Sequence, residues 1–295
     1  MEKNVLSIAK GVEEIAPYEF CEEKQIETVS FPSSLKRIGE GAFAEADDLR
    51  FLDLPEGLER IEARSLAGLC GVCFVPKTVS YIGKEAFGTS ALILLEGEEK
   101  SMNAYRETYQ SEPDYPDSYY RGPSMGGGET TITYYGYGSI VKEHVPHDDY
   151  LKYAGQAPWM EFQGLVLRKP RSNQEYALAF EAIKGKKLTE ENSYELRSFI
   201  RDSFIKNADR CFLVADDSGA PGVYVDFGSG YFNSKARFQF IDPNFSQAHA
   251  EALLALCETI RPNGKEIEVF YDKPFIACLE AHGYVYARGV YRKAD

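Results

Sequence analysis

Two histidines in the middle of the chain have the spacing of a metal site. His144 and His147 stand three residues apart, beside Asp148 and Asp149. Imidazole and carboxylate groups are common zinc ligands, so this arrangement could hold an ion. A solvated loop accounts for the same residues without any ion, and we expect a loop here.

The six cysteines offer little more chemistry. Cys70 and Cys73 form a C-x-x-C motif, but no second cysteine pair or histidine cluster completes a zinc site. Both fall where a repeat needs small apolar residues, and unpaired cysteine is commonly buried, so we expect free buried thiols. Cys278 and His282, four residues apart, are interpreted as a buried thiol beside a histidine at a helix end. The sequence therefore predicts no metal site.

Motifs of nucleophilic and nucleotide-binding enzymes are also missing. The chain contains no G-x-S-x-G, and no cysteine lies in a recognisable catalytic motif. The glycine run 126–128 is not followed by G-K-[ST], which favours a turn or a flexible segment over a phosphate loop. Asp226, Asp242 or Glu268 could act as a base near the sheet, although a lone carboxylate at a strand end is more often solvated.

Charge and composition narrow the classes of partner. The net charge is −13: residues 1–100 carry 19 acidic and 11 basic residues, residues 101–150 carry 8 and 3, and residues 151–295 carry 19 of each. An acidic front half repels phosphate backbones, which argues against nucleic acid as a partner. No stretch approaches the ~20 apolar residues of a membrane-spanning helix. The N-terminus lacks a signal-peptide core, so we expect a cytoplasmic protein, although a signal removed earlier would leave the same sequence.

A repeat dominates the first hundred residues. Short apolar triplets begin at positions 6, 29, 52 and 73, and apolar residues recur at fixed distances after each start. A single turn of this kind cannot bury its own apolar side, whereas a stack of turns forms one continuous core. We expect the triplets to form one parallel sheet along a single face, with a buried column made of Ile15, Ile38, Ile61 and Ile82.

Two phrases of this repeat are diagnostic. The segments 35–43 (LKRIGEGAF) and 79–87 (VSYIGKEAF) closely resemble the bacterial surface-antigen class of leucine-rich repeats, also called the BspA or Treponema type, over about residues 5–97. In that family the repeats serve protein or surface recognition, and many members are secreted. The resemblance implies a protein partner bound through the repeat face. The alternative is a short stack that only caps its neighbour.

Composition changes sharply after the repeats. Ten of the 20 tyrosines lie between Ser101 and Tyr153, together with several prolines and the glycine run. We therefore expect residues 101–158 to be a capping or linker segment that packs on a domain face. The β-branched and aromatic residues of 130–141 favour a strand.

Residues 159–295 alternate between strand and helix patterns. Ser246 is expected to cap one helix and Asp272 the last one. Strands are expected near 164–168, 211–215, 222–227, 237–241, 266–270 and 284–291, and helices near 173–183 and from 189, 246 and 272.

This order resembles the GCN5-related N-acetyltransferase fold over about residues 160–293. The local matches are 211–222, which is similar to that family's central hairpin, and 278–284, which is similar to its final helix and Gly-aromatic pair. The predicted fold class is a short β-rich leucine-rich-repeat solenoid (1–100) joined through 101–158 to an α/β domain that resembles this fold (159–295).

The resemblance also implies where acetyl-CoA would bind. Family members hold its pyrophosphate with a Q/R-x-x-G-x-G/A loop at a helix start, because glycine lets backbone N–H groups approach the phosphates. Here His249 and Glu251 stand about where the glycines belong, and Leu279 stands where many members carry a tyrosine general acid. The candidate cofactor-binding residues of this degenerate loop are Ser246, Gln247, Ala248, His249 and Ala250.

Two functions follow from these patterns. The first is a non-catalytic recognition protein whose repeats bind a protein partner and whose acetyltransferase-like domain is a scaffold without a cofactor. The second is a divergent acyl-CoA-dependent N-acyltransferase that uses the repeats to choose its substrate. The missing glycines and the missing tyrosine favour the first.

Overall fold

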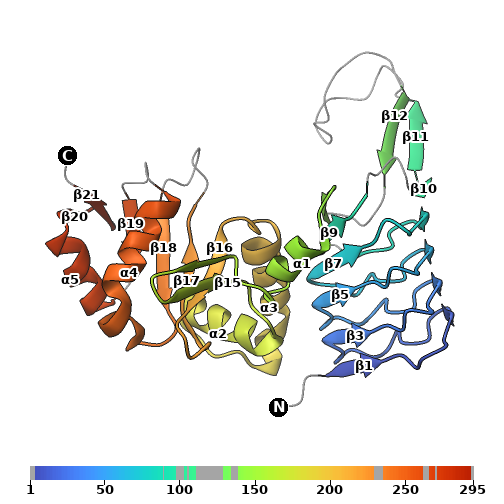
Figure 1. Ribbon diagram of the computed structural model, residues 1–295, viewed down its shortest axis with the longest axis horizontal. Coiled ribbons are helices and arrows are strands. Elements are labelled where there is room, and N and C mark those ends of the chain that lie inside the picture. Colours follow the sequence, from blue (N-terminus) through green and yellow to red (C-terminus); the bar gives the residue numbers. More distant parts are fainter. Residues whose placement is uncertain are drawn as a thin grey trace.

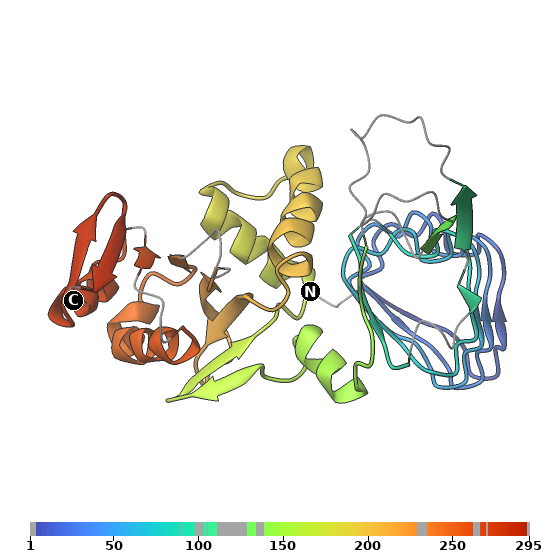
Figure 2. The ribbon, with the colours of Figure 1, turned by 90° about the horizontal axis from the view of Figure 1, so that it is seen from above.

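The computed structural model describes residues 4–88, 90–97, 103–104, 106–110, 129–133, 139–228, 235–261, 266–269 and 271–293. A β-solenoid and an α/β body stand side by side, and helices of the second body lie between its sheet and the solenoid (Figures 1 and 2).

The solenoid carries two parallel sheets rather than the single one expected. Each turn has two extended segments, the apolar triplet and a pair that ends in isoleucine, and each set stacks separately. The first sheet has the order β1 (Val5–Ser7), β3 (Thr28–Ser30), β5 (Phe51–Asp53), β7 (Val72–Val75), β9 (Leu92–Leu95) and β13 (Ile140–Lys142). The second consists of β2 (Glu14–Ile15), β4 (Arg37–Ile38), β6 (Arg60–Ile61), β8 (Tyr81–Ile82) and β10 (Asn103–Ala104).

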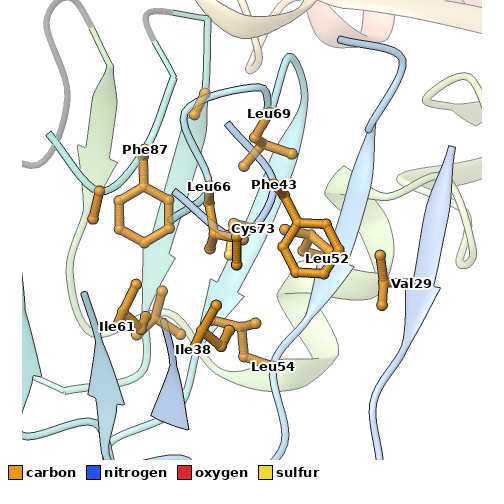
Figure 3. Close-up of a cluster of buried hydrophobic side chains, with 14 of the residues drawn as sticks. Val29, Ile38, Phe43, Leu52, Leu54, Ile61, Leu66, Leu69, Cys73 and Phe87 are labelled. Carbon is orange, nitrogen blue, oxygen red and sulfur yellow. The ribbon is translucent and has the colours of Figure 1, made fainter. Parts of the chain in front are cut away.

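The predicted isoleucine column is confirmed. Ile15, Ile38, Ile61 and Ile82 are direct partners in the register of the second sheet, and each is at most 1% exposed. Every second residue of the first sheet, such as Leu52, points into the same interior and shares one core with the four isoleucines. Figure 3 shows how the large side chains of successive turns fill the space between the two sheets. Burial of this apolar surface, which no turn achieves alone, holds the stack together.

One backbone position is left-handed in every turn. It lies three residues after each isoleucine and is occupied by Tyr18, Gly41, Arg64 and Glu85, with φ between 52° and 62°. Residues other than glycine adopt this backbone conformation at a cost in conformational energy, because their Cβ crowds the following carbonyl oxygen. At position 41 glycine also leaves room for a neighbouring ring: an added Cβ would lie 2.3 Å from Cε1 of Tyr18, which would have to move.

The segment after β9 extends the solenoid. A hairpin of β11 (Arg106–Gln110) and β12 (Glu129–Thr133) projects from the last turn, and β13 then pairs in parallel with β9 (Figure 1). The strand expected within 130–141 is therefore two strands in different sheets. The glycine run 126–128 lies outside the described residues.

The α/β body is built on an eight-stranded sheet, antiparallel except where β18 pairs with β19. Its spatial order is β14 (Met160–Phe162), β15 (Leu165–Arg168), β16 (Cys211–Ala215), β17 (Pro221–Asp226), β18 (Lys235–Phe240), β19 (Glu266–Val269), β21 (Val290–Lys293) and β20 (Tyr284–Ala287). The expected strand 284–291 is a hairpin instead, because Arg288 and Gly289 both adopt positive φ and reverse the chain.

Helices cover this sheet. They are α1 (His147–Tyr153), α2 (Asn173–Lys184), α3 (Ser193–Phe199), the π-helix η3 (Ile200–Ile205), α4 (Phe245–Ile260) and α5 (Lys273–Ala281). The helix expected from Thr189 begins as the 3-10 turn η2 (Glu190–Asn192). Within the described ranges, no helix combines enough length and apolar character to cross a membrane.

Two predicted helix caps have different outcomes. Asp272 caps α5 as expected, because its Oδ1 accepts from the backbone N–H of Phe275 at 2.8 Å. The prediction for Ser246 is wrong: α4 begins at Phe245, and its N-cap residue, two residues before Ser246, is Asn244, which makes no side-chain cap. Ser246 therefore lies inside the first turn, where it is fully buried and its hydroxyl donates to Asp272 Oδ2 at 2.9 Å.

Candidate functional site

The predicted cofactor loop falls in the first two turns of α4. The Ser246 hydroxyl donates to Asp272. Gln247 and Ala248 are exposed, and Ala250 is half-buried. His249 lies with its Nε2 3.3 Å from Asp216 Oδ2, and its ring packs on Phe245 at 4.6 Å between centroids. Ser246 and His249 are therefore engaged within the α/β body, whereas Gln247 and Ala248 are open to solvent.

The backbone before α4 is also occupied. The N–H of Asn244 donates to Asp242 Oδ1 at 2.9 Å, and that of Phe245 donates to the Asp242 carbonyl at 3.1 Å. The Phe245 ring covers Gly222, where an added Cβ would lie 1.9 Å from the ring. Two backbone N–H groups at the start of α4, where a pyrophosphate would be held, are therefore already engaged in the turn.

The three carboxylates considered as bases are not free. Asp226 lies 3.5 Å from the guanidinium of Arg210, and its Oδ1 accepts from the Gly228 N–H at 2.8 Å. Glu268 pairs with Arg237 at 2.7 Å, and Asp242 holds the turn before α4. One oxygen of each carboxylate therefore already has a partner within the α/β body.

A hollow of 300 Å³ lies beside Asp226, between η3 and strands β16 to β18. Tyr224 lines it, and burial raises the pKa of this phenol well above its usual range. Desolvation also raises the pKa of the neighbouring Cys211 thiol to about 12. A thiol and a phenol that stay protonated are poor nucleophiles. At the other end of the sheet, Leu279 is fully buried in the core.

The α/β body covers the outer face of the first solenoid sheet over strands β5, β7 and β9, whereas the outward residues Val5, Ser7 and Ser30 of β1 and β3 stay exposed. Phe51 stacks on Tyr176 of α2 at 6.4 Å, and Phe74 packs against Tyr150 of α1 at 5.7 Å between ring centroids. Phe51 and Phe74 are 5% and 1% exposed, and they share one apolar core with residues of α2 and α3. The solenoid and the α/β body are therefore joined by a hydrophobic interface.

Polar contacts border this interface. Arg197 of α3 forms an ion pair with Asp47 and donates to the Gly68 carbonyl at 3.3 Å. His147 lies 2.8 Å from Asp53 and packs edge-on against Phe74 at 4.9 Å. The solvated loop expected around His147 is thus the first turn of α1, and its imidazole contacts the solenoid.

Sequence reasoning missed this interface although a signal was present. In the first strands an apolar residue that points inward is followed by a polar one, as in Leu6–Ser7 and Val29–Ser30. In β7 and β9 every residue is apolar and buried. A strand that is apolar on both sides is buried on both faces. The C-x-x-C motif lies where the strands become apolar on both sides: Cys70 contacts the α/β body, whereas Cys73 points into the solenoid. Both cysteines are free and buried, as predicted.

The second sheet leaves a solenoid face open. Arg37 bridges Glu14 and Glu62 at 2.9 Å each, and Arg60 reaches the same Glu62 oxygen at 3.0 Å while lying over the ring of Tyr81 at 4.1 Å. We call these five residues the outer ladder. Arg37 and Arg60 are register partners on the adjacent strands β4 and β6. The network therefore holds two guanidinium groups and one aromatic ring in fixed positions on neighbouring turns.

An exposed tyrosine extends this surface. The Tyr18 side chain is 52% exposed, and its hydroxyl donates to Glu40 Oε1 at 3.0 Å. The hydrogen bond and the charge of Glu40 raise the pKa of Tyr18. Tyrosine and arginine are the side chains most often central to protein interfaces, so this face has the composition of a docking surface.

Comparison with known proteins agrees with the repeat assignment. Residues 3–111 match the family described as BspA type Leucine rich repeat region, in 6 copies. Over these residues the chain is similar to that family. No curated protein matches the chain. A solved protein from Desulfovibrio desulfuricans, described as an acetyltransferase of the GNAT family, matches 43% of this chain and 97% of its own length with 13% identity, at a TM-score of 0.28.

Proposed function

We propose that this is a protein-recognition molecule whose BspA-type repeats bind a protein partner through the outer ladder. The observation that carries the proposal is the division of the solenoid surface. Strands β5, β7 and β9 of the first sheet are buried against the chain's own α/β body, whereas the second sheet keeps Arg37 and Arg60 partly exposed beside the half-buried Tyr81. A partner of the repeats has this second face available.

The ordered ion pairs favour recognition over a merely solvated surface. An exposed ion pair contributes about 0–1 kcal/mol to stability on its own, and a network of several charges contributes more. An interface gains when its side chains are already held in their bound positions, because less rotamer entropy is lost on binding. Glu62, with its side chain 15% exposed, fixes both guanidinium groups in this way.

The α/β body acts as a scaffold in this proposal. We take residues 1–100 as the recognition unit, 101–158 as the segment that caps and joins, and 159–295 as a non-catalytic acetyltransferase-like unit without a cofactor. The six free cysteines fit a reducing compartment, which supports a cytoplasmic location. The alternative is a divergent N-acyltransferase in which the segment from Ser246 to Ala250 would meet acetyl-CoA.

Site-specific photo-crosslinking tests the proposal. A photoreactive phenylalanine analogue at position 81, in cells that make the protein, should capture one protein. The matched control is the same substitution at Tyr271, a 97% exposed tyrosine of the α/β body. Calorimetry with the purified partner should then show that Arg60→Glu raises the Kd at least tenfold, whereas Lys187→Glu, a reversal at an 85% exposed lysine, leaves it unchanged. Capture at position 271 alone, or a Kd insensitive to Arg60→Glu, contradicts the proposal.

A further inference from the structure

Three potential metal ligands meet where α4 passes the end of α5. Cys278 lies in the last turn of α5, His282 follows that helix, and Glu251 projects from the second turn of α4. One ligand atom from each residue lies within 4.8 Å of the others. His282 Nε2 is 3.3 Å from Glu251 Oε2, and Cys278 Sγ is 3.9 Å from His282 Nδ1.

The backbone fixes how His282 presents its nitrogens. Its Nδ1 lies 2.9 Å from the carbonyl oxygen of Cys278, so Nδ1–H donates to that oxygen. This leaves Nε2 facing the Glu251 carboxylate. Histidines that bind metals commonly donate the other ring N–H to a backbone carbonyl, which orients the imidazole. An imidazole nitrogen and a carboxylate oxygen at this distance share either a proton or a cation.

The Glu251 carboxylate is the group most open to a cation. Glu258, two turns further along α4, influences both Cys278 and His282 electrostatically, but it forms an ion pair with Lys293. The Glu251 carboxylate, 73% exposed, has His282 as its ion-pair partner in the described part of the chain.

We propose that Glu251, Cys278 and His282 bind a divalent transition-metal ion of the zinc class. One thiolate sulfur, one imidazole nitrogen and one carboxylate oxygen form a mixed donor set that suits Zn²⁺, whereas hard ions such as Mg²⁺ and Ca²⁺ prefer oxygen alone. Binding replaces the S–H bond of Cys278 by an S–metal bond and releases that proton to solvent. Because Glu251 and His282 are exposed, a fourth position stays open to water.

The ion would join two elements that now meet through side chains alone. Its ligands come from α4 and from the end of α5, next to the hairpin of β20 and β21 that closes the chain. The site lies on α4 and α5, far from the outer ladder on the solenoid. A test of metal binding is therefore independent of a test of the proposed function.

Cobalt spectroscopy on the full chain tests the site. Co²⁺ titrated into chelator-treated protein should give a thiolate-to-cobalt charge-transfer band that saturates at one ion per chain, and one equivalent of Zn²⁺ should abolish the band. Cys278→Ser should remove the band. His282→Gln and Glu251→Gln, which change exposed side chains, should each weaken Zn²⁺ binding at least tenfold.

Matched controls separate this site from adventitious binding. Cys21→Ser changes a half-buried thiol in the solenoid, and Glu280→Gln changes an exposed carboxylate on α5 itself. Both should leave the band and the Zn²⁺ affinity unchanged. Absence of the charge-transfer band in the folded wild type, or a band that survives both Cys278→Ser and His282→Gln, overturns the proposal.

Discussion

The imidazole Nε2 of His147 lies 2.8 Å from Oδ2 of Asp53, a residue 94 positions earlier in the chain. This contact brings α1 onto strand β5 at the edge of the interface between the solenoid and the α/β body. Both side chains are nearly half exposed, so the pair itself stabilises the fold little, by about 0–1 kcal/mol. The apolar residues beside it carry the interface.

Phe74→Ala should destabilise both bodies together. The ring is 1% exposed and packs against Tyr150 and His147, so its removal leaves a cavity that should cost about 3–5 kcal/mol. Denaturant unfolding followed by circular dichroism should show one transition in the wild type and a lower midpoint in the variant. His147→Ala, at the solvated rim, should shift the midpoint far less. Two well-separated transitions in the wild type would show that the bodies are not coupled.

Ile61→Ala tests the buried column of the solenoid. Ile61 is fully buried between Ile38 and Ile82, and the cavity should cost about 2–5 kcal/mol in the free energy of unfolding. Val5→Ala, at a 47% exposed position of β1, is the matched control and should change stability by less than about 0.5 kcal/mol. Equal effects of the two substitutions would contradict the stacking.

Gly41→Ala should be more costly than Gly11→Ala. Both glycines have positive φ, so alanine strains the backbone at each by about 1–2 kcal/mol. Only at position 41 must the new Cβ also displace the Tyr18 ring, since nothing lies within 4 Å of the corresponding point at Gly11. Thermal unfolding of the two variants measures the difference. Combination with Tyr18→Ala should remove the excess cost of Gly41→Ala, and an unchanged excess would show that the ring is not its cause.

Lys169 should make stability depend on pH. It is 2% exposed, its Nζ donates to the Cys211 carbonyl and lies 3.7 Å from the Phe212 ring centre, and desolvation lowers its pKa to about 7. Between pH 7 and the usual lysine value near 10.5, the unfolded chain binds this proton and the folded chain does not, so stability rises with pH. From pH 7 to 9 the wild type should gain about 2 kcal/mol relative to Lys169→Met. Urea unfolding at these two pH values measures it, and a pH-independent difference would contradict a neutral buried amine.

The solenoid was predictable because its signal is local and repeated. Each turn places isoleucine at the same position, so four copies of the pattern specify the column of Ile15, Ile38, Ile61 and Ile82. The second sheet was not foreseen, because strands of two residues such as Glu14–Ile15 are too short to show an alternating pattern. In the α/β body the expected strands and helices are present, but the final strand is a hairpin and the helix expected from Thr189 is divided into η2, α3 and η3. The edge strand β14 was not expected.

The contacts that carry the proposals could not be read from local patterns. Arg37 and Glu62 meet because two solenoid turns stack, and Glu251 meets Cys278 because α4 packs beside α5. The misplaced cap shows the same limit on a smaller scale. Serine before an apolar stripe predicts an N-cap, but Ser246 is recruited by Asp272, which lies 26 residues away in sequence.

Isothermal titration calorimetry of acetyl-CoA and CoA with the chelator-treated protein tests the central claim most directly. That claim is that the α/β body is a scaffold and not an acyl-CoA-dependent enzyme. Ser246 is buried, His249 pairs with Asp216, and the turn before α4 uses its own backbone donors, so we predict no saturable binding below about 100 µM, equivalent to a binding free energy weaker than about −5.5 kcal/mol. Saturable binding of acetyl-CoA at micromolar or tighter Kd would contradict the account and make the acyltransferase the better description.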